Sequence, residues 1–351
     1  LRNLPMTTAR SSVNSVIPSY VGLWGLIDRT GKFILQPTYD GITEFTDDRA
    51  VVSTGSKSGF IDITGKQITD IKYDEYSFFK NGLAAVNRNT YWGVIDANGK
   101  EILPTEYFNV DFPEKQTIRA TYFYTETPVY ALFDRTGKLL YEKDLDDIAY
   151  LGNSLYRVGK NGRFGMIDQN GKEILPVEYS GIGVFYQHAC IVEKDEQSAI
   201  INTKGETIVD FGKYDTYDYF INGLVRVSKN ELYGYLDLNG KEVIPVQYAE
   251  LSYLTGNMTY FKRDDKYGLV GRDGKERDWI YDEFSDFAFG LALVSIDNKY
   301  GFINDNGQQV IPPEYDYAEP FSSPITWCTT DGKSGTINLQ GKTVVPFIYD
   351  S

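Results

Sequence analysis

The sequence predicts an all-β fold built from ten tandem repeats, and three observations lead to this prediction. A pattern of an aromatic residue, a glycine, an apolar strand and a glycine turn recurs throughout the 351 residues. The chain is rich in residues that favour strands, with 28 Tyr and 20 Phe. No run with the period of a helix separates the copies, which disfavours parallel βαβ units.

The glycine after the aromatic residue marks each copy, and alanine replaces it twice. It falls at Gly25, Gly59, Gly93, Ala131, Gly165, Ala199, Gly234, Gly268, Gly301 and Gly335. Neighbouring positions are 33 to 38 residues apart, so each repeat is about 34 residues long. We therefore expect a single array over residues 16–351, preceded by a polar leader or cap at residues 1–15.

Each repeat is expected to form a three-stranded β-meander. In the third copy, the strands are predicted at Gly82–Asn87, Tyr91–Asp96 and Glu101–Pro104. The proline that closes the third strand has no N–H for a ladder hydrogen bond. It should therefore lie at a strand end or at a sheet edge.

A hairpin turn explains the residues between the second and third strands. Asp or Asn at the first turn position accepts backbone hydrogen bonds, and a glycine three residues later adopts the left-handed conformation. Asp28 with Gly31 and Asp96 with Gly99 are two examples. These turns also resemble parts of phosphate-binding and calcium-binding loops, but their glycine and oxygen-ligand spacings fit neither motif.

The strands are apolar on both faces, so each sheet must be covered by the repeats before and after it. In the third copy, Trp92 and Val94 point to one face and Ile95 points to the other. A tyrosine follows the third strand in nine of the ten repeats, and six of these repeats have a phenylalanine six residues later. We expect these rings to pack between consecutive sheets, with the marker glycine admitting a neighbouring backbone or ring.

Stacked sheets of this kind can continue as an open superhelix or close into a propeller-like ring. The repeat is shorter than the ~40–45 residues of a typical propeller blade. Ten copies also exceed the ~4–8 blades of most propellers. The open superhelix is therefore favoured over the ring.

The copy WGVIDANGKEILPTEYF, which begins at Trp92, resembles the repeat of the WG repeat family of bacterial proteins, also called KWG repeats. Ten copies in register extend the resemblance from about Val16 to Asp350. The chain departs from the family pattern because Trp occupies the aromatic position only at Trp24 and Trp92. The family is defined by its repeat rather than by an activity, so the resemblance implies an architecture and no catalytic residue.

Composition excludes several classes of partner. The formal net charge of −14 disfavours binding to nucleic acid or to anionic lipid. No apolar stretch reaches the ~18 residues needed to cross a membrane. Cys190 and Cys328 are the two cysteines and form neither a metal motif nor a disulfide framework, and no cofactor or metal site is predicted.

Catalysis is not expected, because repeated equivalent units lack the single asymmetric constellation that an enzyme needs. His188 is the one histidine, and Cys190 would share its face of a strand. A catalytic pair at these residues is disfavoured against a core or strand-end role. Carboxylate pairs such as Asp264 with Asp265 are inevitable among 49 acidic residues.

The departures from the repeat are the better candidates for function, since insertions in an array map to exposed loops. The fourth copy carries an insertion within Phe112–Tyr130 that includes Tyr122 and Tyr124, unless it is a decayed repeat. A second aromatic cluster adds Tyr217 and Tyr219. We expect these four tyrosines to contact a partner.

The leading hypothesis is a non-catalytic interaction scaffold that presents a curved, acidic, tyrosine-rich surface to a protein partner. A glycan-binding or cell-wall-binding adhesion module is the alternative, followed by an enzyme or a toxin-associated domain. If a signal peptide has been removed, we expect the cell envelope or secretion; otherwise we expect the cytoplasm.

Overall fold

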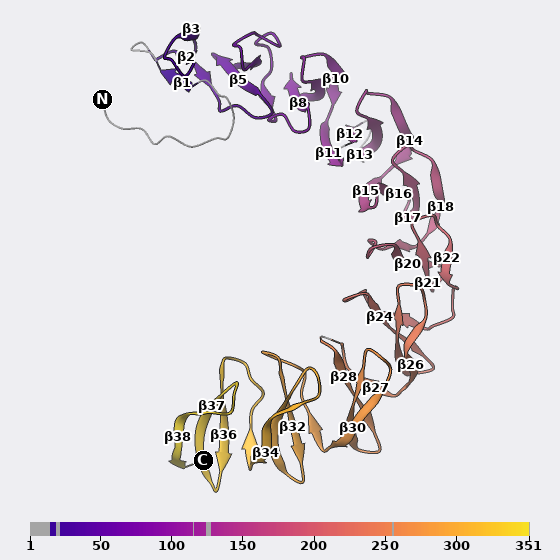
Figure 1. Cartoon of the computed structure of the whole chain (residues 1–351). Helices are drawn as coiled ribbons and strands as arrows, with labels where there is room; N and C mark the ends of the chain where they lie inside the picture. Colours follow the sequence, from indigo (N-terminus) through magenta and orange to yellow (C-terminus); the bar gives the residue numbers. More distant parts are fainter. Residues whose placement is uncertain (1–14, 19–21, 115, 124–127, 255, 351) are drawn as a thin grey trace. The chain divides into compact units, whose positions relative to one another are not determined.

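The structure is a computed structural model that describes residues 15–18, 22–114, 116–123, 128–254 and 256–350. All regular secondary structure in these residues is β, and it forms ten antiparallel sheets in chain order (Figure 1). The prediction of an all-β tandem array of sheets is confirmed. Residues 1–14 of the predicted leader or cap lie outside the described residues.

The chain falls into two compact parts, Leu1–Glu178 and Tyr179–Ser351. The first part contains sheets 1 to 5. Their strands are β1 (Ser15–Pro18), β2 (Trp24–Ile27) and β3 (Phe33–Tyr39) in sheet 1; β4 (Gly41–Ile42), β5 (Arg49–Thr54) and β6 (Lys57–Asp62) in sheet 2; β7 (Glu75–Tyr76), β8 (Leu83–Arg88), β9 (Tyr91–Asp96) and β10 (Glu101–Tyr107) in sheet 3; β11 (Asn109–Glu114), β12 (Thr117–Phe123), β13 (Pro128–Asp134) and β14 (Leu139–Leu145) in sheet 4; and β15 (Asp147–Gly152), β16 (Leu155–Lys160), β17 (Arg163–Asp168) and β18 (Glu173–Tyr179) in sheet 5.

The second part contains sheets 6 to 10. Their strands are β19 (Gly181–Ile182), β20 (Ala189–Lys194), β21 (Gln197–Asn202) and β22 (Thr207–Val209) in sheet 6; β23 (Thr216–Tyr217), β24 (Leu224–Lys229), β25 (Leu232–Asp237) and β26 (Glu242–Tyr248) in sheet 7; β27 (Glu250–Leu251), β28 (Met258–Arg263), β29 (Lys266–Gly271) and β30 (Glu276–Tyr281) in sheet 8; β31 (Glu283–Phe284), β32 (Leu291–Ile296), β33 (Lys299–Asn304) and β34 (Gln309–Tyr315) in sheet 9; and β35 (Tyr317–Ala318), β36 (Ile325–Thr330), β37 (Lys333–Asn338) and β38 (Thr343–Asp350) in sheet 10.

Sheets 3 to 10 contain four strands rather than the predicted three. The additional strand comes first and is often only two residues long, as in β7, where Tyr76 pairs with Val86 of β8. A two-residue strand is too short to show alternation in the sequence, which explains why it was not predicted. In sheet 4, the insertion of the fourth repeat gives longer first and second strands, β11 and β12.

A bulge in β10, the last strand of sheet 3, explains the marker glycine. In sheet 3, Trp92 pairs with Tyr107 and Val94 pairs with Leu103, so three residues of β10 lie opposite Gly93 alone. A Cβ on Gly93 would lie 2.6 Å from the carbonyl oxygen of Leu103. The close neighbour is thus the third strand of the same repeat. Pro104 lies within this bulge on an edge strand, in agreement with the predicted sheet edge.

The predicted turn chemistry is also present. Asp96 Oδ1 accepts hydrogen bonds from the backbone N–H groups of Asn98 (2.8 Å) and Lys100 (2.9 Å), and Gly99 has a φ of +79°. Equivalent side-chain oxygens accept the equivalent bonds at Asp28, Asp62, Asp134, Asp168, Asn202, Asp237, Asn304 and Asn338. These oxygens therefore organise turns.

The core of each part lies between consecutive sheets. Phe60 of sheet 2 packs edge-on against Phe79 at 5.1 Å between ring centroids, in a cluster with Tyr73 and Val86. The tyrosine after the third strand is buried at Tyr39, Tyr73, Tyr107, Tyr179, Tyr214, Tyr248, Tyr281 and Tyr315. Tyr349, which lies within the last strand of sheet 10, β38, is 54% exposed. These rings therefore pack between sheets as predicted, and the choice of an open superhelix over a ring stays a prediction.

Candidate interaction surface

Four loops of the second part form the candidate surface, which we call the loop ridge. Each loop joins the short first strand of a sheet to its second strand, and the described residues of the loops are 183–188, 218–223, 252–254 with 256–257, and 285–290. The exposed apolar side chains of the loop ridge are Val184 (74% exposed), Tyr219 (79%), Ile221, Tyr253 and Phe289. Each of the four loops carries at least one of them.

The local sequence explains why these side chains are exposed. Tyr219 is followed by Phe220, which packs into the core of sheets 6 and 7, and Tyr253 is followed by the buried Leu254. The loop of sheet 7 closes with reciprocal backbone hydrogen bonds between Ile221 and Leu224 (2.8 and 3.0 Å). Burial of one residue and closure of the turn leave the preceding side chain in solvent.

Contacts between consecutive loops hold the loop ridge together. The rings of Tyr186 and Phe220 stack at 6.0 Å between centroids, joining the loops of sheets 6 and 7. Arg226 of sheet 7 lies 3.9 Å from the ring centroid of Tyr253, joining sheet 7 to sheet 8. Ser252 Oγ donates to Asp286 Oδ1 at 2.9 Å, joining sheet 8 to sheet 9. The exposed side chains are thus carried by loops of consecutive sheets, which are joined either directly or through Arg226.

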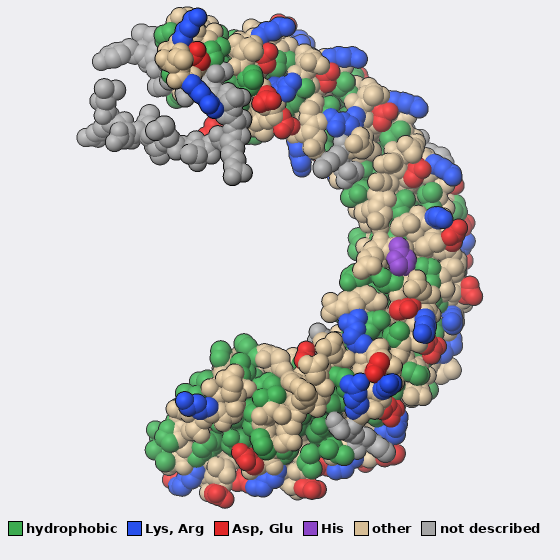
Figure 2. All heavy atoms as spheres, viewed as in Figure 1, with side chains coloured by type: hydrophobic (Ala, Val, Ile, Leu, Met, Phe, Trp, Pro, Cys, Tyr) green, Lys and Arg blue, Asp and Glu red, His purple; other side chains and the backbone are tan. Residues whose placement is uncertain are grey.

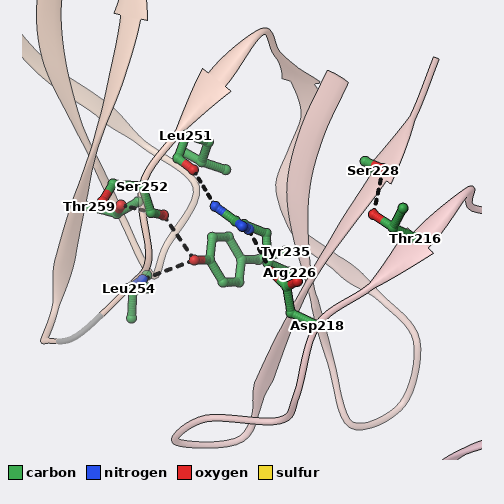
Figure 3. Close-up of polar contacts among 9 residues, drawn as sticks. All are labelled: Thr216, Asp218, Arg226, Ser228, Tyr235, Leu251, Ser252, Leu254 and Thr259. Atoms are coloured by element: carbon green, nitrogen blue, oxygen red, sulfur yellow. Dashed lines mark hydrogen bonds and ion pairs between the residues drawn. The ribbon is translucent and has the colours of Figure 1, made fainter. Parts of the chain in front are cut away.

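The loop of sheet 8 is fixed by a polar network with sheet 7 (Figure 3). The Tyr235 hydroxyl donates to the Ser252 carbonyl (3.0 Å) and accepts the N–H of Leu254 (2.9 Å). Thr259 Oγ1 donates to the same Ser252 carbonyl at 2.8 Å. Burial raises the pKa of Tyr235 to about 12. Tyr253, which lies between Ser252 and Leu254, is therefore held on an ordered backbone.

Arg226 lies beside this network, between Leu251 and Asp218 (Figure 3). Its Nε donates to Asp218 Oδ2 at 2.7 Å, and its Nη1 donates to the Leu251 carbonyl at 2.8 Å. The guanidinium also lies over the ring of Tyr233. One largely buried side chain thus links the loop of sheet 7 to the short first strand of sheet 8.

The four predicted contact tyrosines have different environments. Tyr219 is on the loop ridge, whereas Tyr217 packs against Tyr214 at 5.8 Å between centroids, and burial raises its pKa to about 12. Tyr122 is half-buried against Tyr107 at 4.9 Å. Tyr124 lies outside the described residues. A contact role for all four tyrosines stays a prediction.

Sequence reasoning missed Val184 and Tyr253. Each lies five residues after the repeat tyrosine, as Tyr219 does. This spacing was the available signal. The position was overlooked because its residue type varies, with Glu44, Phe78, Asp286 and Pro320 in other repeats.

The chemical candidates occupy structural positions. Cys190 is fully buried and its Sγ donates to the Gly183 carbonyl at 3.1 Å, while burial raises its pKa to about 12; His188 is exposed in the loop before β20. Asp264 and Asp265 are the two left-handed residues of a hairpin turn. A thiol that stays protonated near neutral pH is a poor nucleophile.

Acidic residues are widely paired. Lys57 and Lys299 make equivalent ion pairs with Asp74 and Asp316, each 17 residues further along the chain, and Lys229 Nζ lies 2.9 Å from Asp215 in a different arrangement. Acidic and basic side chains are interspersed on the face seen in Figure 2. Within the described ranges there is no group of three or more His, Cys, Asp and Glu placed to hold a metal ion. The same part of the chain has no helix with the length and apolar character that a membrane crossing requires.

The comparisons with solved structures give only low similarity. The chain is 13% identical to a eukaryotic initiation factor, with a TM-score of 0.32 and coverage of 97% of this chain and 98% of that one. It is 11% identical to Kluyveromyces lactis Hsv2p, with a TM-score of 0.28 and coverage of 76% and 93%. For the extracellular domain of a hybrid two component system from B. thetaiotaomicron, the identity is 12%, the TM-score is 0.25 and the coverage is 97% and 60%.

The family comparison is more informative. No curated protein matches the sequence. The model of the WG containing repeat matches residues 24–57, 59–89, 92–115, 164–196, 200–233, 233–267, 280–300, 300–333 and 335–351, which is more than half of the chain. The matched ranges leave out residues 116–163, which include β12 to β14 of sheet 4, yet β11 to β14 form the same antiparallel order as the strands of the matched repeats. The chain therefore belongs to the family of proteins that contain WG repeats.

Proposed function

We propose that this chain is a non-catalytic interaction scaffold that binds a protein partner through the loop ridge. The observation that carries the proposal is the exposure of Val184, Tyr219 and Tyr253 at one equivalent position of three consecutive sheets. Exposed aromatic side chains on an ordered backbone supply contact area at low entropic cost. The repeat offers several such anchors in a row.

A scaffold role also agrees with the environments of the reactive groups. Cys190 and Cys328 are both buried, and burial raises the pKa of each thiol to about 12. The turn carboxylates accept backbone hydrogen bonds in repeat after repeat, as Asp96 does. The structural role of the turn carboxylates therefore accounts for their recurrence in the repeats.

The test compares three baits in an affinity capture with identification by mass spectrometry. They are the unaltered chain, a ridge variant with Val184→Ser and Tyr219→Ser, and a control variant with Tyr317→Ser. Tyr317 is 50% exposed on β35, outside the loop ridge. We expect to identify a protein that the unaltered chain and the control variant capture and that the ridge variant does not capture. Once purified, this protein should bind the unaltered chain and the control variant more tightly than it binds the ridge variant.

Capture of the same proteins by all three baits would overturn the proposal, because the loop ridge would then make no contribution. Glycan-array binding without a ridge-dependent protein would favour the adhesion module instead. Both substituted side chains are largely in solvent, so the ridge variant should keep the far-ultraviolet circular dichroism of the unaltered chain.

A further inference from the structure

The stacking of the sheets sets the spacing of the anchors on the loop ridge. Sheets packed face to face lie about 10 Å apart. Consecutive loops are in direct contact, as the 2.9 Å hydrogen bond between Ser252 and Asp286 shows. Val184, Tyr219 and Tyr253 stand at one equivalent position per sheet. An apolar anchor therefore recurs about every 10 Å along the loop ridge.

This spacing matches an extended polypeptide. A chain in the polyproline II conformation has three residues per turn and a rise of about 3.1 Å per residue, so side chains three residues apart lie on one face about 9 Å apart. An α-helix would offer further side chains at its i+3 and i+4 positions, between those spaced at 10 Å. An extended segment with an apolar residue at every third position would place one apolar side chain at each anchor of the loop ridge. It would leave fewer side chains between the anchors than an α-helix would.

The charge of the loop ridge selects for basic residues between those anchors. The four loops contain Asp218 and Asp286 and no Lys or Arg. Glu250 and Glu283 are exposed on the short strands β27 and β31 that lead into two of the loops. Asp218 is paired with Arg226, so Asp286, Glu250 and Glu283 provide most of the negative potential.

We propose that the loop ridge binds an extended, basic segment of a partner protein that carries an apolar side chain at every third residue. This proposal rests on the proposed function and specifies the partner's chemistry. The apolar side chains contact Val184, Tyr219 and Tyr253, and the intervening Lys or Arg side chains face the carboxylates.

The test uses fluorescence anisotropy with labelled synthetic peptides and the whole chain. The first peptide is four copies of Leu-Lys-Pro, about 12 residues that span four loops in polyproline II. The second has the same composition with its leucines contiguous, and the third has Glu in place of Lys. We expect the first peptide to bind about tenfold more tightly than the others, and raised salt to weaken its binding.

The same variants separate this proposal from the broader one. The Val184→Ser, Tyr219→Ser ridge variant should bind the Leu-Lys-Pro peptide about tenfold more weakly, and Tyr317→Ser should bind it unchanged. The proposal of an extended basic partner would be overturned if all three peptides bound equally. It would also be overturned if the ridge variant bound the Leu-Lys-Pro peptide as tightly as the unaltered chain does. If affinity capture still finds a ridge-dependent protein, that result leaves the proposed function standing and rejects only this partner chemistry.

Discussion

The guanidinium carbon of Arg226 lies 3.9 Å from the centroid of the Tyr253 ring, although the two residues belong to different sheets. The same position of the second strand holds Arg119 and Arg157 in the first part of the chain. Arg119 binds Asp111 and the Ile148 carbonyl of the next sheet. Arg119 and Arg226 therefore link consecutive sheets from this position, whereas Arg157 binds Asp147 of its own sheet.

Replacement of Arg226 by alanine should lower the free energy of unfolding by about 2 kcal/mol. The substitution leaves Asp218 and the Leu251 carbonyl without their 2.7 and 2.8 Å donors. Urea denaturation followed by tyrosine fluorescence measures the change. The matched control is Arg163→Ala, because Arg163 is exposed and makes a 3.4 Å contact with the Glu178 carbonyl. Equal destabilisation by both variants would refute the idea that Arg226 stabilises the contact between sheets 7 and 8.

Replacement of Gly93 by alanine should cost about 2–3 kcal/mol, because the new Cβ would lie 2.6 Å from the Leu103 carbonyl oxygen. Gly162→Ala is the comparison: Gly162 has a φ of +72° and nothing within 4 Å of its Cβ position. It should cost only the conformational strain, about 1 kcal/mol. The denaturation midpoints of the two variants test this prediction. A smaller decrease in stability for Gly93→Ala than for Gly162→Ala would contradict the bulge explanation.

The aspartate after the repeat tyrosine supports the hairpin of the following sheet. Asp215 accepts hydrogen bonds from Lys229 Nζ (2.9 Å) and from the N–H of Asn230 (2.6 Å), and its hydrogen bond with Lys229 is the main reason that its pKa is lowered. Asp215→Ala should lower the urea midpoint, whereas Glu106→Ala, an exposed change on β10, should leave it in place. An unchanged urea midpoint in Asp215→Ala would show that the hydrogen bonds of Asp215 make no measurable contribution to stability.

Stability should fall at alkaline pH. Burial raises the pKa values of Tyr217, Tyr235 and Tyr248 to about 12, above the ordinary value of about 10. The folded state therefore binds more protons than the unfolded state above pH 10, and their contribution is complete below about pH 10 and lost as the pH approaches 12. Denaturation midpoints measured between pH 8 and 12 test this, and a flat profile would argue against buried neutral tyrosines.

The open superhelix predicts an elongated particle in solution. Small-angle X-ray scattering should give a maximum dimension larger than that of a closed disc of the same 39.8 kDa mass. The prediction rests on the length and number of the repeats. A pair-distance distribution typical of a compact ring would contradict the prediction of an open superhelix.

Much of the repeat could be predicted from the sequence because its determinants are local. The recurring run of an aromatic residue, a glycine and apolar residues predicted the second strand of the repeat, Tyr91–Asp96, which the structure contains with the same bounds. The Asp96 and Gly99 turn followed from side-chain hydrogen bonding and left-handed φ, which depend on residues four or fewer apart. Tyrosine burial between sheets followed from repetition, since a sheet with two apolar faces needs a neighbour on each side.

The tertiary structure decided which side chains remain on the surface. Tyr217 and Tyr219 are two residues apart, and a continuous strand would have placed them on one face. Because β23 ends at Tyr217 and the chain then turns, Tyr217 packs on Tyr214 and Tyr219 lies in solvent. The sequence by itself determined the repeat and its turns through local chemistry. The alignment of the loops into the loop ridge was decided by contacts between sheets, because Arg226 and Tyr253 meet through the stacking of two repeats.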